Sequence, residues 1–183
     1  MGGSTIWLVG MMGAGKTAVG RALAERLGVP FFDSDEEIER RSGHSVAEIF
    51  ARRGEAGFRE LERKAIGALS GTTAVVALGG GAIAEPGMAE RLGRSGTVVY
   101  LRATPETLSE RVGEGEGRPL LAGLDARERK GRLRALLAQR KIHYGSASIT
   151  IDTDGATVEQ LAQRLAQALE QAEEDSVEGE GGS

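Results

Sequence analysis

Short apolar runs alternate with longer segments of helical periodicity along most of the chain. Five runs have strand character, and most are bounded by glycine or aspartate: Thr5–Val9, Pro30–Phe32, Ala74–Leu78, Thr97–Leu101 and Ser148–Ile151. The spacing of apolar residues predicts helices over Lys16–Leu27, Ser45–Arg53, Glu55–Leu69, Pro86–Leu92, Pro105–Val112, Ala126–His143 and Thr157–Glu170. Strands that alternate with helices are typical of βαβ units, so the pattern predicts an α/β fold with a mostly parallel sheet.

Composition narrows the class of protein. The chain has 183 residues, of which 40% are hydrophobic, and this size fits one domain. It has no cysteine, which excludes disulfides and thiolate metal sites and favours a cytoplasmic setting. No apolar run approaches the roughly 20 residues of a membrane span. The early run Ile6–Val9 is too short for a signal peptide.

Charge separates a folded domain from a tail. The formal net charge is −4, and residues 170–183 carry six acids without Lys or Arg. We therefore expect a single domain over residues 1–169 and a disordered acidic tail over 170–183. The rest of the chain is close to neutral, which disfavours a dedicated nucleic-acid binder but is compatible with a local basic pocket for anions.

A phosphate-binding loop is the strongest local motif. Residues 10–17 read GMMGAGKT and match GxxxxGK[ST] at every fixed position, between an apolar strand and a predicted helix. Backbone N–H groups of such a loop surround phosphate oxygens, and Lys16 would reach the β- and γ-phosphates. The Thr17 hydroxyl could ligate Mg²⁺. The motif alone does not distinguish a GTPase, an ATPase and a kinase.

Two carboxylates follow the second predicted strand. Asp33 and Asp35 should emerge at the same sheet edge as the phosphate loop, because ligands of open parallel sheets bind beyond the carboxyl ends of strands. One could orient an attacking hydroxyl and the other support Mg²⁺ through water. The alternative is that they cap the helix that starts near Glu36.

Three glycines and two arginines are further candidate residues for binding the acceptor substrate. Gly79, Gly80 and Gly81 end the central strand and would let the backbone approach a ligand, although a flexible turn would also explain them. Arg59 lies off the apolar stripe of its helix, and on its own it is better explained as a solvated surface residue. Arg140 falls on the apolar face of its predicted helix, where a cation needs an anionic partner, either an acid of the fold or a bound carboxylate.

A glycine-rich stretch over residues 113–117 precedes Arg118 and resembles a mobile lid, here expected over about 112–125. Closure of a lid would bring the Arg118 charge to the transferring phosphoryl group and exclude water. A basic surface turn is the simpler alternative.

In order and spacing, these motifs together resemble shikimate kinase over roughly residues 5–165. The shared segments are GMMGAGKT at 10–17, DSD at 33–35, FRELE at 58–62, GGG at 79–81, GRPLL at 117–121 and the helix from Arg140 to Tyr144. One departure is Ile142, where the family often has proline. That change concerns the end of the helix more than the chemistry.

The resemblance implies a nucleoside-monophosphate-kinase type of three-layer α/β fold, with a five-stranded parallel sheet in the order 2-3-1-4-5. It implies transfer of the ATP γ-phosphoryl group, with Mg²⁺, to the 3-hydroxyl of shikimate, by a monomer in aromatic amino-acid biosynthesis. Lys16, Asp35 and Arg118 would be catalytic. The acceptor would contact Asp35, Arg59, Gly79, Gly80, Gly81 and Arg140. ATP would contact Gly13, Ala14, Gly15, Lys16, Thr17, Ala18, Arg111, Arg118 and Thr153, and Mg²⁺ would be held by Thr17 and, through water, Asp33.

Two other functions fit part of the pattern. Another small-molecule kinase, acting on gluconate or a nucleoside monophosphate, would share the phosphate loop and lid but would not need arginines at both 59 and 140. A non-catalytic nucleotide-binding module would leave the acceptor-side residues without a role, and no NKxD-type guanine-reading segment is evident.

Overall fold

The strands form one parallel sheet at the centre of the molecule. The computed structural model describes residues 4–113, 119–121 and 123–180. The strands are β1 (Thr5–Val9), β2 (Phe31–Asp33), β3 (Val75–Ala77), β4 (Gly96–Arg102) and β5 (Ile149–Asp152). Their spatial order is β2-β3-β1-β4-β5, and every neighbouring pair is parallel. The predicted strand order is confirmed.

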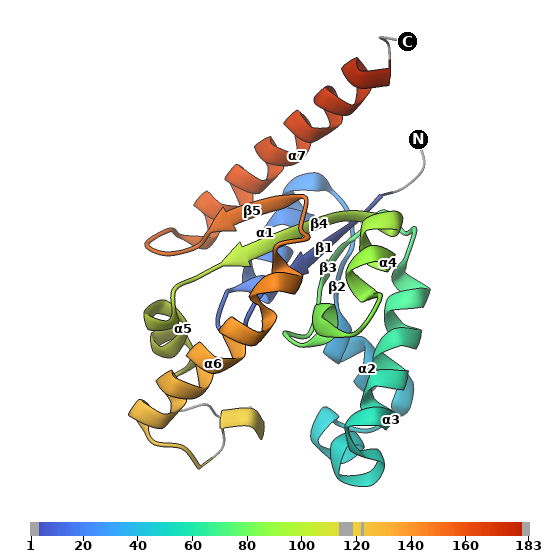
Figure 1. The fold of residues 1–183 in the computed structure, drawn as a ribbon. Coiled ribbons are helices and arrows are strands. Elements are labelled where there is room, and N and C mark those ends of the chain that lie inside the picture. The colour runs from blue at the N-terminus through green and yellow to red at the C-terminus, as the bar shows by residue number, and fades with distance from the viewer. Residues whose placement is uncertain (1–3, 114–118, 122, 181–183) are drawn as a thin grey trace.

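Helices cover both faces of the sheet (Figure 1). They are α1 (Lys16–Leu27), α2 (Ser34–Ser42), α3 (Val46–Leu69), α4 (Met88–Ser95), α5 (Pro105–Val112), α6 (Ala126–Tyr144) and α7 (Val158–Glu180), with short 3₁₀ turns η1 (Ala82–Ala84) and η2 (Pro119–Leu121). Helices α2 and α3 pack together on one side of the molecule, and α5 and α6 pack together on the other. The helical pairs therefore flank the carboxyl ends of the strands, where the candidate residues lie.

The central strands are buried on both faces, which explains their continuous apolar sequence. Trp7 and Leu8 of β1 and Val75 and Val76 of β3 are fully excluded from solvent. With few aromatic residues, most of the core consists of Leu, Val, Ile and Ala side chains from the strands and from α1, α6 and α7. This rigid sheet fixes the loops at its carboxyl edge.

Helix α3 contains the break that the sequence predicts between residues 53 and 55. Gly54 has φ 64° and ψ −172°, a conformation that interrupts the helix and that glycine adopts without steric cost. The predicted separation of two helical segments is therefore confirmed, and the second segment carries Arg59 toward the sheet.

The helix α2 was only indicated by its capping residues. Asp33 is its N-cap, and the carboxylate of Asp33 accepts a hydrogen bond from the Asp35 backbone N–H at 3.0 Å. The capping alternative is thus correct for Asp33. Capping the helix does not exclude Asp33 from the candidate site, because its other carboxylate oxygen, Oδ2, accepts a hydrogen bond from Thr17.

The C-terminal end differs from expectation. Helix α7 continues to Glu180, so the prediction of a disordered tail is wrong for residues 170–180. Ala, Gln and Glu in this stretch are good helix formers, and they extend a helix already anchored by buried Leu161 and Leu165. Among the described residues, no helix has the length and apolar character needed to cross a membrane.

Candidate active site

The phosphate loop connects β1 to α1 at the carboxyl edge of the sheet. Gly13 and Gly15 have φ of 81° and 94°, and a Cβ at Gly13 would lie 2.9 Å from the Val112 side chain. Gly15 is the N-cap of α1 and provides no side-chain cap. The first backbone N–H groups of α1 therefore face an anion site with the positive end of the helix dipole behind them.

Lys16 arches back over this loop. Its Nζ donates hydrogen bonds to the carbonyl oxygens of Gly10 at 2.8 Å and Met11 at 3.0 Å. The ammonium group is thus held above the loop, where it can contact phosphates that the backbone cradles.

Thr17 and Asp33 bring two oxygen atoms together beside Lys16. The Thr17 hydroxyl donates to Asp33 Oδ2 at 2.9 Å, and both residues line the cavity described below. Mg²⁺ in kinase sites typically uses one or two protein oxygens and fills its other positions with water and phosphate oxygens. The described residues contain no cluster of three or more acidic or histidine ligands, and the Thr17–Asp33 pair fits this sparse kind of Mg²⁺ site.

Asp35 is the carboxylate best placed to receive a proton. Its Oδ1 is buried and makes no hydrogen bond within the described structure. Burial, followed by the neighbouring charge of Asp33, raises the pKa of Asp35 to about 6, while the charge of Lys16 opposes the rise. A carboxylate with a pKa near neutrality can accept a proton from a hydroxyl and still be ionised at working pH.

The three glycines form a strip between β3 and η1, and charged groups crowd its open side. A Cβ at Gly79 would lie 3.1 Å from Asp35 Oδ1 and 3.2 Å from Glu62 Oε1. The Gly79 N–H donates to the Ser34 hydroxyl at 3.0 Å, and the Gly80 carbonyl accepts a hydrogen bond from Tyr144. These hydrogen bonds hold the glycine strip in place, so it is not a flexible turn.

Two guanidinium groups converge on Gly81. A Cβ placed there would lie 2.7 Å from Arg59 Nη2 and 3.3 Å from Arg140 Nη2. The two arginines come from α3 and α6, which lie on opposite sides of the sheet edge. Their forks thus meet at one point beside the glycine strip, an arrangement that suits a planar carboxylate.

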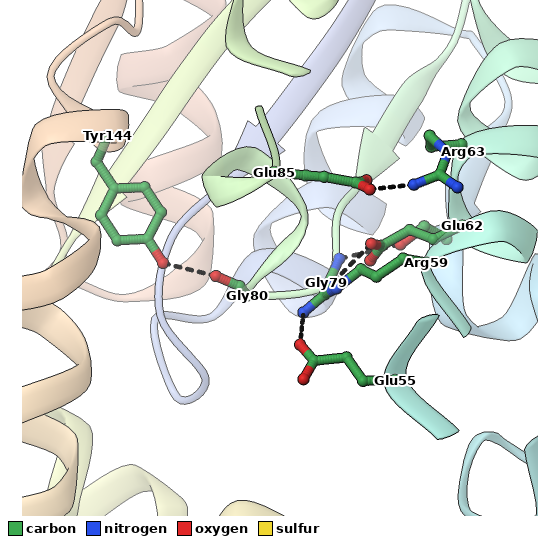
Figure 2. Close-up of polar contacts among 9 residues, drawn as sticks. Glu55, Arg59, Glu62, Arg63, Gly79, Gly80, Glu85 and Tyr144 are labelled. Carbon is green, nitrogen blue, oxygen red and sulfur yellow. Dashed lines mark hydrogen bonds and ion pairs between the residues drawn. The ribbon is translucent and has the colours of Figure 1, made fainter. Parts of the chain in front are cut away.

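The two arginines differ in how the protein holds them. Arg59 pairs with Glu62 at 2.6 Å and with Glu55 at 3.4 Å, as Figure 2 shows, and its side chain is only 21% exposed. The expectation of a merely solvated Arg59 is therefore wrong. Arg140 is half-buried, and no ion pair joins it to an acid in the described part of the chain. Its Nη1 donates to Met11 Sδ at 3.7 Å, and its guanidinium group also forms a hydrogen bond with the Tyr144 side chain.

Glu62, the last residue of the FRELE segment, lies beside Gly79, a position that the motif alone does not indicate. Its side chain is 1% exposed, and burial raises its pKa despite the opposing charge of Arg59. A signal was present: position 62 lies four residues after Phe58 and three before Ala65, on the buried stripe of α3, where an acid needs a specific partner.

A cavity of about 420 Å³ joins the phosphate loop to the acidic side. It is lined by Met12, Gly13, Gly15, Lys16, Thr17, Ala18, Asp33, Asp35, Leu78, Gly79, Gly80 and Arg111. Arg59 and Arg140 are not among the lining residues, but Arg140 Nη1 would lie 3.3 Å from a Cβ on the lining residue Gly80.

Arg111, which also lines the cavity, contacts Thr153. Arg111 donates to the Thr153 hydroxyl at 3.0 Å and to its carbonyl at 2.7 Å, and it reaches the Ala14 carbonyl at 3.5 Å. Thr153 is fully buried, so it holds Arg111 against the phosphate loop. The predicted lid residue Arg118 lies outside the described residues.

This fold, with a phosphate loop facing a basic and acidic acceptor cavity, defines the class of P-loop phosphoryl-transfer enzymes. The comparisons then give the family. The family model for shikimate kinase matches residues 12–170. The chain belongs to the shikimate kinase family.

Individual relatives agree over nearly the full length. A shikimate kinase of Symbiobacterium thermophilum is 46% identical over 171 residues, covering 91% of this chain and 96% of the relative. One of Salinispora tropica is 49% identical over 165 residues, covering 88% and 95%. A solved structure of shikimate kinase from Acinetobacter baumannii in complex with shikimate superposes with a TM-score of 0.86 at 41% identity, covering 93% and 94%.

Proposed function

We propose that this enzyme transfers the γ-phosphoryl group of ATP to the 3-hydroxyl of shikimate, giving shikimate 3-phosphate for aromatic amino-acid biosynthesis. The observation that carries the proposal is the convergence of Arg59 and Arg140 beside Gly81, the residue after Gly80, which lines the cavity together with the phosphate loop. A small acid bound there by its carboxylate would present its hydroxyls to Asp35. Membership of the shikimate kinase family supports shikimate as that acid.

ATP would lie along the phosphate loop. Backbone groups of residues 13–18 would surround its phosphates, and Lys16 would neutralise charge on the β- and γ-phosphates. Arg111, held by Thr153, would flank the adenine end of the nucleotide. Arg118 would add a further positive charge when the lid closes.

Mg²⁺, when bound, would neutralise charge on the phosphate oxygens. Thr17 would ligate it through its hydroxyl, and Asp33 would hold one of its waters. The hydrogen bond from the Asp35 backbone N–H fixes the Asp33 carboxylate. The contact that caps α2 would therefore also orient Asp33 toward a water on Mg²⁺.

Asp35 would act as the base. As the acceptor oxygen bonds to the γ-phosphorus, the bond from that phosphorus to the β–γ bridging oxygen breaks, and Asp35 takes the hydroxyl proton. ADP leaves with the bridging oxygen. The raised pKa of Asp35 matches this task, and Lys16 stabilises the charge that develops on the phosphates.

A single chain supplies every group named here, which supports action as a monomer. The arginines come from two helices on opposite sides of the same sheet edge, and no second copy is needed to complete the clamp.

An ADP-release assay with alternative acceptors tests the proposal. With ATP and Mg²⁺, we expect rapid turnover with shikimate and background rates with gluconate, AMP and CMP. Mass spectrometry should find one added phosphate on shikimate. Removal of Mg²⁺ with a chelator should abolish turnover. Activity on a nucleoside monophosphate without activity on shikimate would contradict the proposal, as would nucleotide binding without transfer to any acceptor.

A further inference from the structure

Tyr144 is a buried residue of the site region that the proposed chemistry does not use. It is the last residue of α6 and is fully excluded from solvent. Its ring stacks on that of Tyr100 from β4, with 4.6 Å between ring centroids and an angle of 12° between planes. The stack explains the position of the ring, but it leaves the hydroxyl group to be explained.

The hydroxyl of Tyr144 reaches into the glycine strip. It donates a hydrogen bond of 2.8 Å to the carbonyl oxygen of Gly80, which Figure 2 shows. Gly80 lies after β3 ends at Ala77 and before η1 begins at Ala82, so neither element fixes its backbone. A carbonyl in such a segment needs a partner from elsewhere in the fold, and Tyr144 supplies it.

Gly80 touches both halves of the proposed site. A Cβ built on it would lie 3.3 Å from Arg140 Nη1, 3.4 Å from the Gly10 carbonyl oxygen and 3.5 Å from the Met12 backbone nitrogen. The first atom belongs to the acceptor clamp, and the other two belong to the phosphate loop. A shift of Gly80 would therefore change the space between the acceptor and the phosphates.

Tyr144 and Arg140 are also linked through their helix. They are four residues apart on α6, so they share one face and move together. Helix α6 passes through Ile142, which is 80% exposed, without interruption. The helix thus carries the clamp arginine and the residue that holds the glycine strip as one rigid unit.

We propose that Tyr144 is a positioning residue, whose hydroxyl holds Gly80 so that the Arg140 clamp keeps a fixed distance from the phosphate loop. The inference rests on the proposed function, since it assumes that the acceptor carboxylate binds at Arg140. Burial raises the pKa of Tyr144 to about 12, although the charge of Arg140 and a hydrogen bond with its guanidinium group oppose the rise. The phenol therefore remains a hydrogen-bond donor at every pH at which the enzyme is assayed.

The test compares Tyr144→Phe with Tyr100→Phe. Both changes remove a hydroxyl from the same ring stack, but only the first removes the hydrogen bonds to Gly80 and Arg140. We expect Tyr144→Phe to raise KM for shikimate about fivefold, the effect of one net hydrogen bond, and to leave KM for ATP within about twofold. Tyr100→Phe should leave both KM values within about twofold.

Thermal unfolding of both variants separates positioning from packing. A lowered Tm for Tyr144→Phe with an unchanged KM for shikimate would overturn the inference, and so would equal increases in the two KM values. The proposed function is measured separately, because wild-type turnover with shikimate tests it alone. The ratio of KM for shikimate between Tyr144→Phe and wild type then tests the positioning role of Tyr144.

Discussion

The two sides of the cavity are built in different ways. The phosphate-binding part of the donor side is one contiguous segment, residues 10–18, in which Gly10, Gly13 and Gly15 have positive φ. The acceptor side combines side chains from α2, α3 and α6 with the glycine strip, so its parts lie about a hundred residues apart in sequence, from Asp35 to Arg140. The donor side can therefore form from local structure, whereas the acceptor side exists only when the whole fold does.

The acceptor side also keeps more unsatisfied polar groups. Within the described residues, three buried side-chain oxygens have no hydrogen-bond partner: Asp35 Oδ1, Glu62 Oε1 and Glu85 Oε2. Glu85 follows η1 and pairs with Arg63 of α3 (Figure 2). Buried polar atoms normally find partners, so a cluster of exceptions around the glycine strip indicates a surface arranged for a polar ligand. Four predictions test this difference between the two sides.

The largest effect should come from the donor side. Lys16→Ala should reduce kcat for phosphoryl transfer to shikimate by about 100- to 1000-fold, because the ammonium group stabilises charge that develops on the phosphates. Stopped-assay measurement of ADP and shikimate 3-phosphate would give this rate. Fluorescence of Trp7, the single tryptophan, checks that the core is intact. A variant that is folded and retains more than a tenth of wild-type kcat would contradict the role of Lys16.

On the acceptor side, Arg140→Ala should raise KM for shikimate about 30-fold or more, since losing a charge-assisted contact to a carboxylate costs at least about 2 kcal/mol. KM for ATP should stay within about twofold. Arg134→Ala is the matched control: it lies on the same helix, but its exposed side chain pairs with Glu106. Equal losses for both substrates would instead indicate that Arg140 supports folding.

The pH dependence should follow Asp35. Because its pKa is raised to about 6, the ionised base predominates above that pH and disappears below it. We expect kcat/KM for shikimate to be level above about pH 7 and to fall about tenfold per pH unit below 6. Steady-state rates from pH 5 to 8, with Trp7 fluorescence recorded in parallel, would measure this. A profile that stays level to pH 5 would rule out Asp35 as the titrating base.

A smaller effect is expected from Gly81→Ala. The added methyl group would crowd Arg59 and Arg140, but both contacts are with the ends of flexible side chains that can shift. KM for shikimate should rise about fivefold, with KM for ATP unchanged. Gly93→Ala in α4 is the control, because its Cβ would meet no atom within 4 Å. An unchanged KM for shikimate would place the acceptor away from Gly81.

The phosphate loop could be predicted from the sequence, because its motif is local: residues 10–17 lie between β1 and α1 as expected. The resemblance to shikimate kinase implied the correct strand order, and the strand ends differ from the expected ones by at most one residue; β2, for example, ends at Asp33 rather than Phe32. On the acceptor side, Arg140 was detectable because a cation broke the apolar face of its helix.

Other features needed the fold itself. Arg59 alone resembled a solvated surface residue, and only the packing of α3 against the sheet edge shows that it is paired with Glu62 and faces Gly81. The hydrogen bond from Tyr144 to Gly80 joins segments 64 residues apart, which no local pattern indicates. The helical extension to Glu180 was missed because acidic composition was given more weight than the helix propensity of the same residues.

We propose that Arg59 and Arg140 hold the carboxylate of the acceptor. The most direct test of this proposal compares shikimate with shikimate carboxamide, in which the negative charge is removed, for wild type and Arg140→Ala. We expect wild type to bind the amide much more weakly than shikimate, and we expect Arg140→Ala to weaken binding of shikimate but barely change binding of the amide. If the substitution weakened both ligands equally in calorimetric titrations, the carboxylate would not be the group that Arg140 holds, and the claim would be wrong.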